Sequence, residues 1–181
     1  TFCVLLAYGM LQQITGLRLQ DSLGYSSSDA IKGTGALMTS SMALMACVQA
    51  IIFKFSVKNP ARLLLIGALI SVLGFYFLYV GSSFWIYLAG MAILGLGMGL
   101  MFPANLALLS LNSKEHNQAR IASINNIGKG LGFAIGPLLG ATLYQKTTDL
   151  PIIFAIGLAI ITLILSLISM FPPRIKSVHK I

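Results

Sequence analysis

Long uncharged stretches, rather than alternating positions, dominate the hydrophobic pattern of the chain. No charged residue occurs from Gly33 to Phe53 or from Leu63 to Ser113, and only the turn-like sequence GSS at 81–83 interrupts the longer stretch. A membrane helix needs about 20 consecutive apolar residues, whereas a strand of a membrane barrel needs about 10 in alternation. The first stretch therefore predicts one transmembrane helix, and the second predicts a hairpin of two.

Three further spans bring the predicted total to six. They cover Phe2 to Leu17, the segment around Ile121 to Tyr144, and Leu150 to Phe171. The chain starts with Thr1, and no signal peptide precedes the first span, so we expect residues 1–181 to be a fragment of a larger protein. The expected fold class is all-α membrane, with six transmembrane helices.

Composition agrees with a membrane protein. Hydrophobic residues make up 57% of the chain and charged residues 9%, whereas a soluble domain carries about 25% charged residues. The net charge of +8 comes mainly from the second loop, the fourth loop and the tail. Cations in short loops mark the cytoplasmic side, so we expect anionic lipid contact, no nucleic acid, a cytoplasmic C-terminus and, for a bacterial protein, the inner membrane. The cations assigned to that side are Lys54, Lys58, Arg62, Lys114, Arg120, Arg174, Lys176 and Lys180.

The remaining loop cations are expected on the opposite side, each with an acid nearby. Arg18 is predicted to lie in a loop near Asp21, and Lys146 near Asp149. Lys32 follows Asp29 by three residues, which predicts an ion pair at the start of the second helix.

Polar side chains are unequally distributed among the spans. The third and sixth carry almost none, so they are expected to face lipid, while the first, second, fourth and fifth are expected to surround the interior. Two groups of three helices, each with a peripheral last member, are typical of a three-plus-three inverted repeat. Interhelical hydrogen bonding and substrate binding both explain the polar positions. The candidate substrate-binding residues are Tyr8, Gln12, Gln13, Asn105, Asn125 and Lys129.

Two of these predictions concern orientation on a helix. Tyr8 and Gln12 are four residues apart and are expected to share a face, with Gln13 about 100° away. Lys129 lies about 13 Å along its helix from Arg120, with Asn125 one turn before it. It either reaches back toward the cytoplasmic interface or presents a cation to a cavity, where it would bind an anionic substrate group or change protonation.

Glycine recurs every four residues in the fifth span, at Gly128, Gly132, Gly136 and Gly140. This spacing leaves a slanted groove without side chains, into which a second helix can pack closely. Pro137 lies beside the groove and removes one backbone hydrogen bond, which would allow a bend.

Catalytic and metal chemistry have no support in the sequence. Cys3 and Cys47 lie in apolar spans without motif spacing, and His116 and His179 have no companion at ligand spacing. The four acids, Asp21, Asp29, Glu115 and Asp149, are assigned to loops or helix ends. We therefore expect no enzyme activity, no metal and no cofactor.

Several motifs together resemble the major facilitator superfamily of transporters. QQITGLRLQDSLGYSSSDA at 12–30 is similar to the family's polar seventh helix and the loop after it, and KFSVKNPARLLLIG at 54–67 to its basic loop. GFAIGPLLGA at 132–141 resembles a signature of drug/proton antiporters, with Ala141 in place of the last glycine. The basic loop has no acid, and the fourth span no arginine, so the C-terminal half of the family is the better fit.

The resemblance implies helices seven to twelve of a twelve-helix secondary transporter with alternating access. It implies proton-coupled efflux of small amphipathic molecules or drugs; uptake or exchange of an anionic metabolite is an alternative, and a scaffold or channel subunit is another from a different class. The implied partners are a small-molecule substrate, protons, lipid and the N-terminal half of the same transporter. Helix two of that half is the implied occupant of the glycine groove.

Overall fold

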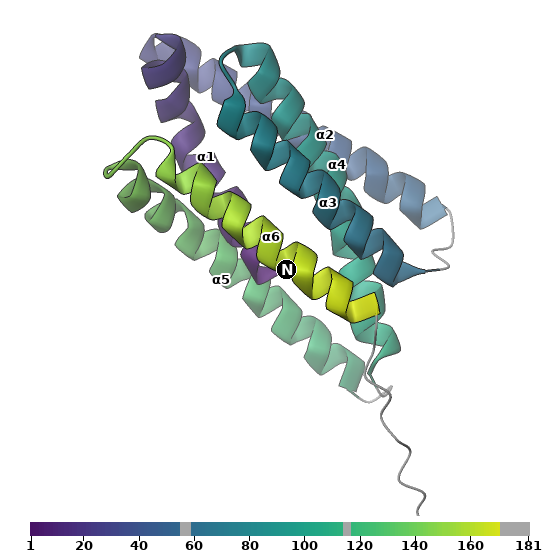
Figure 1. The fold of residues 1–181 in the computed structure, drawn as a ribbon. Helices are drawn as coiled ribbons and strands as arrows, with labels where there is room; N and C mark the ends of the chain where they lie inside the picture. The colour runs from purple at the N-terminus through teal and green to yellow at the C-terminus, as the bar shows by residue number, and fades with distance from the viewer. Residues whose placement is uncertain (55–58, 114–116, 171–181) are drawn as a thin grey trace, which may run out of the picture.

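The computed structural model describes residues 1–54, 59–113 and 117–170. Within them the chain forms helices and no strand, which confirms the all-α fold, and successive helices run in opposite directions in one bundle (Figure 1). The helices are α1 (Phe2–Leu23), α2 (Ser27–Lys54), α3 (Pro60–Val80), α4 (Phe84–Leu111), α5 (Gln118–Tyr144) and α6 (Leu150–Met170). Predictions for Lys58, Lys114, Glu115, His116, Phe171, Arg174, Lys176, His179 and Lys180 lie outside the described residues.

Local signals place the helix ends. Asn59 precedes Pro60, and its side-chain oxygen accepts a hydrogen bond from the backbone N–H of Arg62 at 3.2 Å, so α3 begins with a capped first turn. Ser83 caps α4 in the same way. Gly24 ends α1 with a φ of 67°, a left-handed conformation that glycine adopts without strain.

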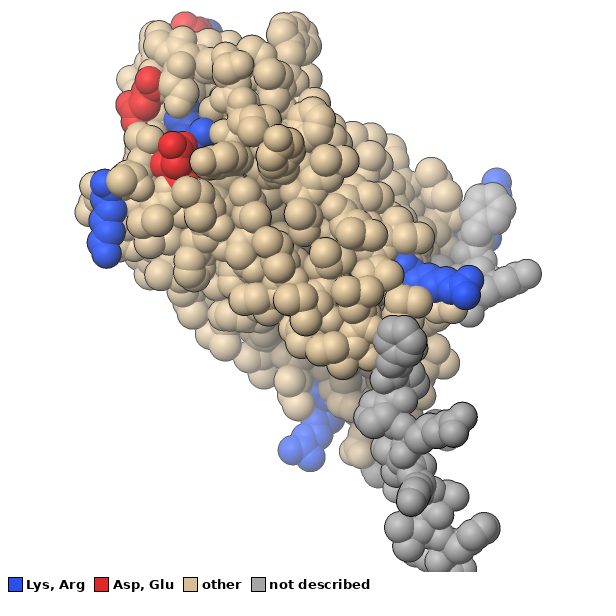
Figure 2. Space-filling model, viewed as in Figure 1, with Lys and Arg blue, Asp and Glu red and all other residues tan. Residues whose placement is uncertain are grey.

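The two ends of the bundle are called the Arg18 end and the Asn112 end. The Arg18 end carries the α1–α2, α3–α4 and α5–α6 connections, and the Asn112 end is the opposite one. All three described acids (Asp21, Asp29 and Asp149) belong to the Arg18 end, and Figure 2 shows the red side chains gathered there on the visible face. The ion pair predicted between Lys32 and Asp29 is present at 3.8 Å.

The prediction that Arg18 lies in a loop was wrong. The first helix was expected to end at Leu17 and the second to begin near Gly33, but α1 continues to Leu23 and α2 begins at Ser27. Only three residues join the two helices. The polar side chains in the last turns of α1 bond to residues of α4, α5 and the α5–α6 connection, and the backbone there stays helical.

Five of the six helices are long and apolar enough to cross a membrane among the described residues. The exception is α5, whose sequence includes Asn125, Asn126, Lys129 and several glycines. This helix packs along α1, the most buried helix of the bundle. Its contact with α1 is made through the small residues Gly132, Gly136 and Gly140, the buried positions of α5.

The helices pack as two groups, one around α1 and one around α4. α1 packs on α5, α6 and α2; α4 lies between α2 and α3; and α6 joins the two groups through α3. The backbones of α1 and α4 come close at few positions, and the two helices meet through apolar side chains in the core. The exposed side chains of α3 and α6 include many large apolar residues, such as Leu69, Leu73, Ile161 and Leu165, as expected for helices that face lipid.

The glycine groove of α5 receives α1, so the partner expected for it was wrong. A Cβ atom on Gly132 would lie 2.7 Å from the backbone oxygen of Phe2, and one on Gly136 would lie 2.7 Å from that of Leu6. Gly140 meets the backbone of α1 one step further along, whereas Gly128 has only ordinary contact at 4.0 Å. The fourfold period thus serves close packing inside this bundle, because backbone meets backbone where side chains are missing.

Glycines of α4 allow a similar approach on two sides. A Cβ on Gly95 would overlap the carbonyl oxygen of Ser41 in α2, and Gly99 also faces α2. Gly90 and Gly97 face α3 instead. The sequence AGMAILGLGMGL therefore places α4 in close contact with both neighbours.

Replacing Gly136 by alanine should destabilise the bundle by about 1–3 kcal/mol, because the new methyl group would press on the backbone of α1. Gly130→Ala is the matched control on the same helix, since a Cβ there meets nothing within 4 Å. Thermal unfolding of both variants of the full gene product in detergent measures the difference. Equal melting temperatures for the two variants would contradict the packing account.

Candidate functional site

A cluster of amide and hydroxyl groups joins the starts of α1 and α5 to α4. The side-chain nitrogen of Asn105 donates to the hydroxyl of Thr1 at 2.7 Å and to the side-chain oxygen of Asn125 at 3.1 Å. The Thr1 hydroxyl donates to that same oxygen at 2.9 Å. α4 and α5 otherwise touch little, so this cluster is a polar link between helices that are not packed closely.

Lys129 lies one turn beyond Asn125 on α5 and contacts an aromatic ring. Its ammonium nitrogen is 5.4 Å from the centre of the Phe102 ring, and Phe102 precedes Asn105 by three residues on α4. Neither ion pair among the described residues involves Lys129, whose side chain is half-buried. A cation over a ring face is stabilised by about 0.5–2 kcal/mol. In the described part of the chain, the charge of Lys129 thus has an aromatic partner but no carboxylate partner.

The other three candidate residues lie elsewhere. Gln12 and Gln13 are exposed, whereas Tyr8 is 5% exposed and packs with Met98 and Met101. Tyr8 and Gln12 therefore do not share an environment, although they are only four residues apart. Gln12 is about 16 Å along α1 from Thr1, so the glutamines are distinct from the asparagine cluster.

Two buried hydroxyl groups stand near one another without a hydrogen-bond partner among the described residues. They belong to Tyr8 on α1 and Ser41 on α2. The other buried serine and threonine hydroxyls of the described helices, such as Thr15 and Ser71, donate to the backbone carbonyl four residues earlier. Tyr8 is thus a buried polar side chain of the core.

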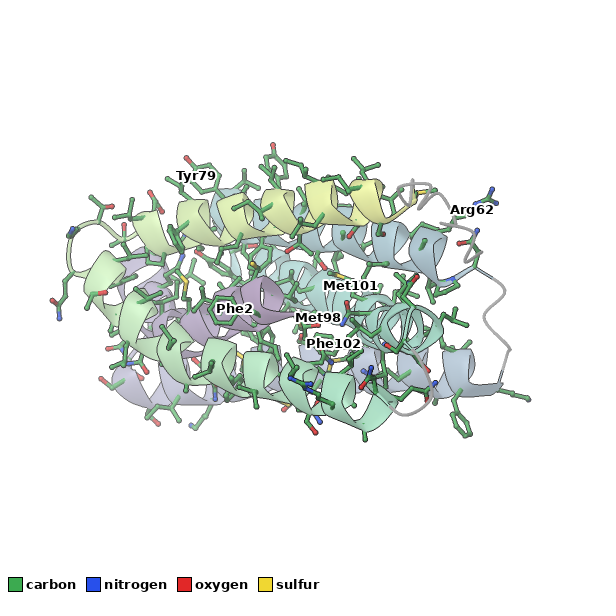
Figure 3. The ribbon with its side chains drawn as sticks, turned by 90° about the horizontal axis from the view of Figure 1, so that it is seen from below. Phe2, Arg62, Tyr79, Met98, Met101 and Phe102 are labelled. Carbon is green, nitrogen blue, oxygen red and sulfur yellow. The ribbon has the colours of Figure 1, made fainter. Side chains whose placement is uncertain are left out.

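A pocket of about 530 Å³ opens between α1, α4, α5 and α6 toward the Asn112 end. Figure 3 shows Phe2, Met101 and Phe102 close together near the start of α1, and Asn105 also lines the pocket. Because the pocket opens beside Thr1, the first residue of the chain, its shape alone supports no binding function.

Sequence reasoning missed two contributors to polar contacts. Phe102 lies within an apolar span, and nothing in the sequence indicates that it meets Lys129, 27 positions later. Arg18 was assigned to a loop, but it is buried, and its side chain is bonded to residues of α4 and the α5–α6 connection. An arginine that directly follows an uncharged span was the available signal for a buried cation.

Neither metal nor thiol chemistry has a geometric basis in the described residues. No three side chains of the His, Cys, Asp and Glu types come together there. The two cysteines are free; Cys3 is half-buried in α1 and Cys47 is exposed on α2. The buried or half-buried polar groups of the described helices are therefore amides, hydroxyls, the ammonium of Lys129 and the guanidinium of Arg18.

Curated relatives of the chain are drug-resistance proteins. The quinolone resistance protein NorA of Staphylococcus aureus, in strains Mu50, N315 and MRSA252, is 23% identical over 173 residues. The match covers 96% of this chain but 44% of each relative, so the chain spans less than half of their length.

The family assignment rests on the whole chain. The sequence pattern of the Major Facilitator Superfamily matches residues 1–181, and the six helices form the half-bundle that this fold contains twice. The chain therefore belongs to the Major Facilitator Superfamily.

Proposed function

We propose that residues 1–181 are the C-terminal half, helices seven to twelve, of a secondary transporter that works by alternating access. Its activity is proton-coupled efflux of small amphipathic molecules or drugs. Family membership supports transport, and the similarity to NorA, a quinolone resistance protein, supports drug efflux. All described acids lie at the Arg18 end, so a membrane carboxylate for proton coupling is assigned to the other half of the transporter.

The observation that carries the proposal is the polar link between α4 and α5. Asn105, Asn125 and Lys129 lie on two helices that belong to different packing groups and touch little elsewhere. Amides and a cation at membrane depth are costly, and they are retained where a bundle faces a cavity or a substrate. We assign substrate contact to these three residues, and a secondary contact surface to Gln12 and Gln13.

The N-terminal half is the proposed partner of two helix faces. α2 is the least buried of the candidate membrane spans, and α5 buries only Gly132, Gly136 and Gly140. The side of α5 away from α1 presents Ile127, Leu131 and Leu138. This apolar surface, rather than the glycine groove, is where we expect the second half to pack, and Pro137 would permit α5 to bend at that interface.

The membrane orientation follows from the charges. Lys54, Arg62 and Arg120 belong to the Asn112 end, and the described acids belong to the Arg18 end. Figure 3 shows Arg62 and Tyr79 at opposite ends of α3. The excess of cations marks the cytoplasmic side, so we propose that the Asn112 end and the C-terminus face the cytoplasm of a bacterial cell.

Exchange or uptake of an anionic metabolite is the second candidate function. The observation that favours it is Lys129, whose ammonium group contacts the Phe102 ring and no carboxylate among the described residues. A half-buried cation whose contact is an aromatic ring, and not a carboxylate, can take an anionic group of the substrate as its counter-ion.

Lys129→Ala should lower transport by about tenfold or more, because a hydrogen bond to a charged group is worth about 1.5–3 kcal/mol. Lys129→Arg should keep most of the activity, since it retains the charge. Initial rates in vesicles containing the full gene product would be measured for one anionic and one cationic amphiphile. A loss confined to the anionic probe favours the second candidate.

The control for this charge is Lys146→Ala, which removes an exposed cation in the connection after α5. It should leave both rates unchanged. Normal transport by both Lys129 variants would remove Lys129 from the mechanism.

Asn125→Ala should raise the KM for substrate severalfold, because it removes the oxygen that Asn105 and Thr1 both contact. The adjacent Asn126→Ala is the matched control, since Asn126 is exposed and makes no hydrogen bond in the described structure. Concentration dependence of transport gives both values. Equal KM values for the two variants would separate the cluster from substrate binding.

A further inference from the structure

Arg18 is a buried cation held by three residues of two other elements at the Arg18 end of the bundle. Its guanidinium donates to the carboxylate of Asp149 at 2.9 Å and to the carbonyl of Thr148 at 3.1 Å, both in the α5–α6 connection. On the other side it donates to the hydroxyl of Tyr87 on α4 at 3.3 and 3.4 Å. Its side chain is 7% exposed, whereas that of Asp149 is 55% exposed.

These contacts add polar links at one end of the bundle. The backbones of α1 and α4 come close at few positions, and along most of their length the two helices meet through apolar side chains. The contact between Arg18 and Tyr87 is a polar link between them at the Arg18 end. A second hydrogen bond, from the Tyr144 hydroxyl to Asp21 at 2.6 Å, ties the end of α5 to the same end of α1. The last turns of α1 are thereby bonded to α4, to α5 and to the segment before α6.

Stability alone is a weak reason for such an arrangement. A buried ion pair loses hydration that its attraction barely repays, and well-packed apolar residues often stabilise a protein as much. The space beside Arg18, lined by Ile14, Thr15 and Tyr87, is only about 10 Å³, room for a single water. The guanidinium therefore depends on its protein partners for its hydrogen bonds. As long as those partners are held in place, the guanidinium fixes the position of α1.

We propose that Arg18 is a positioning residue that clamps the outer part of α1 to α4 and to the α5–α6 connection. With the clamp closed, this part of α1 moves as one body with the bundle. The half-exposed carboxylate of Asp149 is the point at which the clamp can open to water. The consequence for transport rests on the alternating-access function proposed above, because a rocking half-bundle passes motion to its gate only if α1 is fixed to it.

Thiol labelling tests the clamp directly. Thr15 is 6% exposed and lines the small space beside Arg18, so Thr15→Cys reports opening of that region when Cys3 and Cys47 are replaced by serine. The full gene product in nanodiscs would be treated with a soluble maleimide, and the labelling rate measured. Nanodiscs expose both sides, so the result does not depend on membrane orientation.

Asp149→Asn should increase the labelling rate about tenfold, since it removes one charge-assisted contact from the guanidinium. Tyr87→Phe keeps the ring and should give a similar increase through loss of the hydroxyl. Asp29→Asn is the matched control, because it breaks an exposed ion pair with Lys32 at the same end of the bundle and should leave the rate unchanged. Unchanged labelling in both clamp variants, or an equal increase in the control, would overturn the proposal.

Transport kinetics separate positioning from simple stabilisation. Asp149→Asn should lower kcat several-fold while KM stays within about twofold, because the clamp acts on the movement and not on the substrate contacts. An apparent kcat that returns to the unaltered value once the rate is divided by the amount of folded protein would instead indicate a structural role. If the unaltered protein transports nothing but the labelling rates differ as expected, the clamp stands and the proposed transport function fails.

Discussion

The lack of water at membrane depth is the constraint on which the rest of this structure depends. Every polar group that enters the apolar region must find its partner in the protein. A helix pairs its own backbone N–H and C=O groups. Hydroxyls such as those of Thr15, Ser71 and Ser166 donate hydrogen bonds to backbone carbonyls of the preceding turn. Groups that cannot be satisfied within one helix, the amides of Asn105 and Asn125 and the guanidinium of Arg18, instead determine which helices lie near one another.

Close approach of backbones is the other consequence of the same constraint. Lipid is as apolar as a leucine side chain, so helices gain little from hiding apolar residues from it, and packing must supply the attraction. The glycines of α5 and α4 answer this requirement by letting α1, α2 and α3 approach at backbone distance. Only a few positions along each helix are so crowded, which is why Gly136 lies against a backbone while Gly130, six residues earlier, faces open space.

The six helices and the packing role of the glycines could be predicted from the sequence, because both depend on composition and on spacing along one helix; α5 alone among the described helices is less apolar than a typical span. What the sequence could not supply were contacts across long separations. Arg18 was assigned to a loop because its partners Tyr87 and Asp149 are remote in sequence. Tyr8 and Gln12 lie only about 40° apart on a helix, but the border between interior and surface runs between them. The groove of α5 was predicted to receive a helix of an N-terminal half, because a helical period does not identify which neighbour fills it.

The two polar groups of the bundle differ in a way that bears on mechanism. The Arg18 group combines a cation with a carboxylate, a hydroxyl and a carbonyl from fixed positions, so its charge is neutralised within the bundle. The Lys129 group has amides and an aromatic ring but no carboxylate among the described residues, so its charge is not neutralised by them. A moving transporter needs both kinds: a neutralised group holds helices together through the cycle, and an unneutralised one gains free energy only when another group enters. The two groups lie toward opposite ends of the bundle, so the proposed clamp near the Arg18 end and the proposed substrate contacts toward the Asn112 end are separate in space.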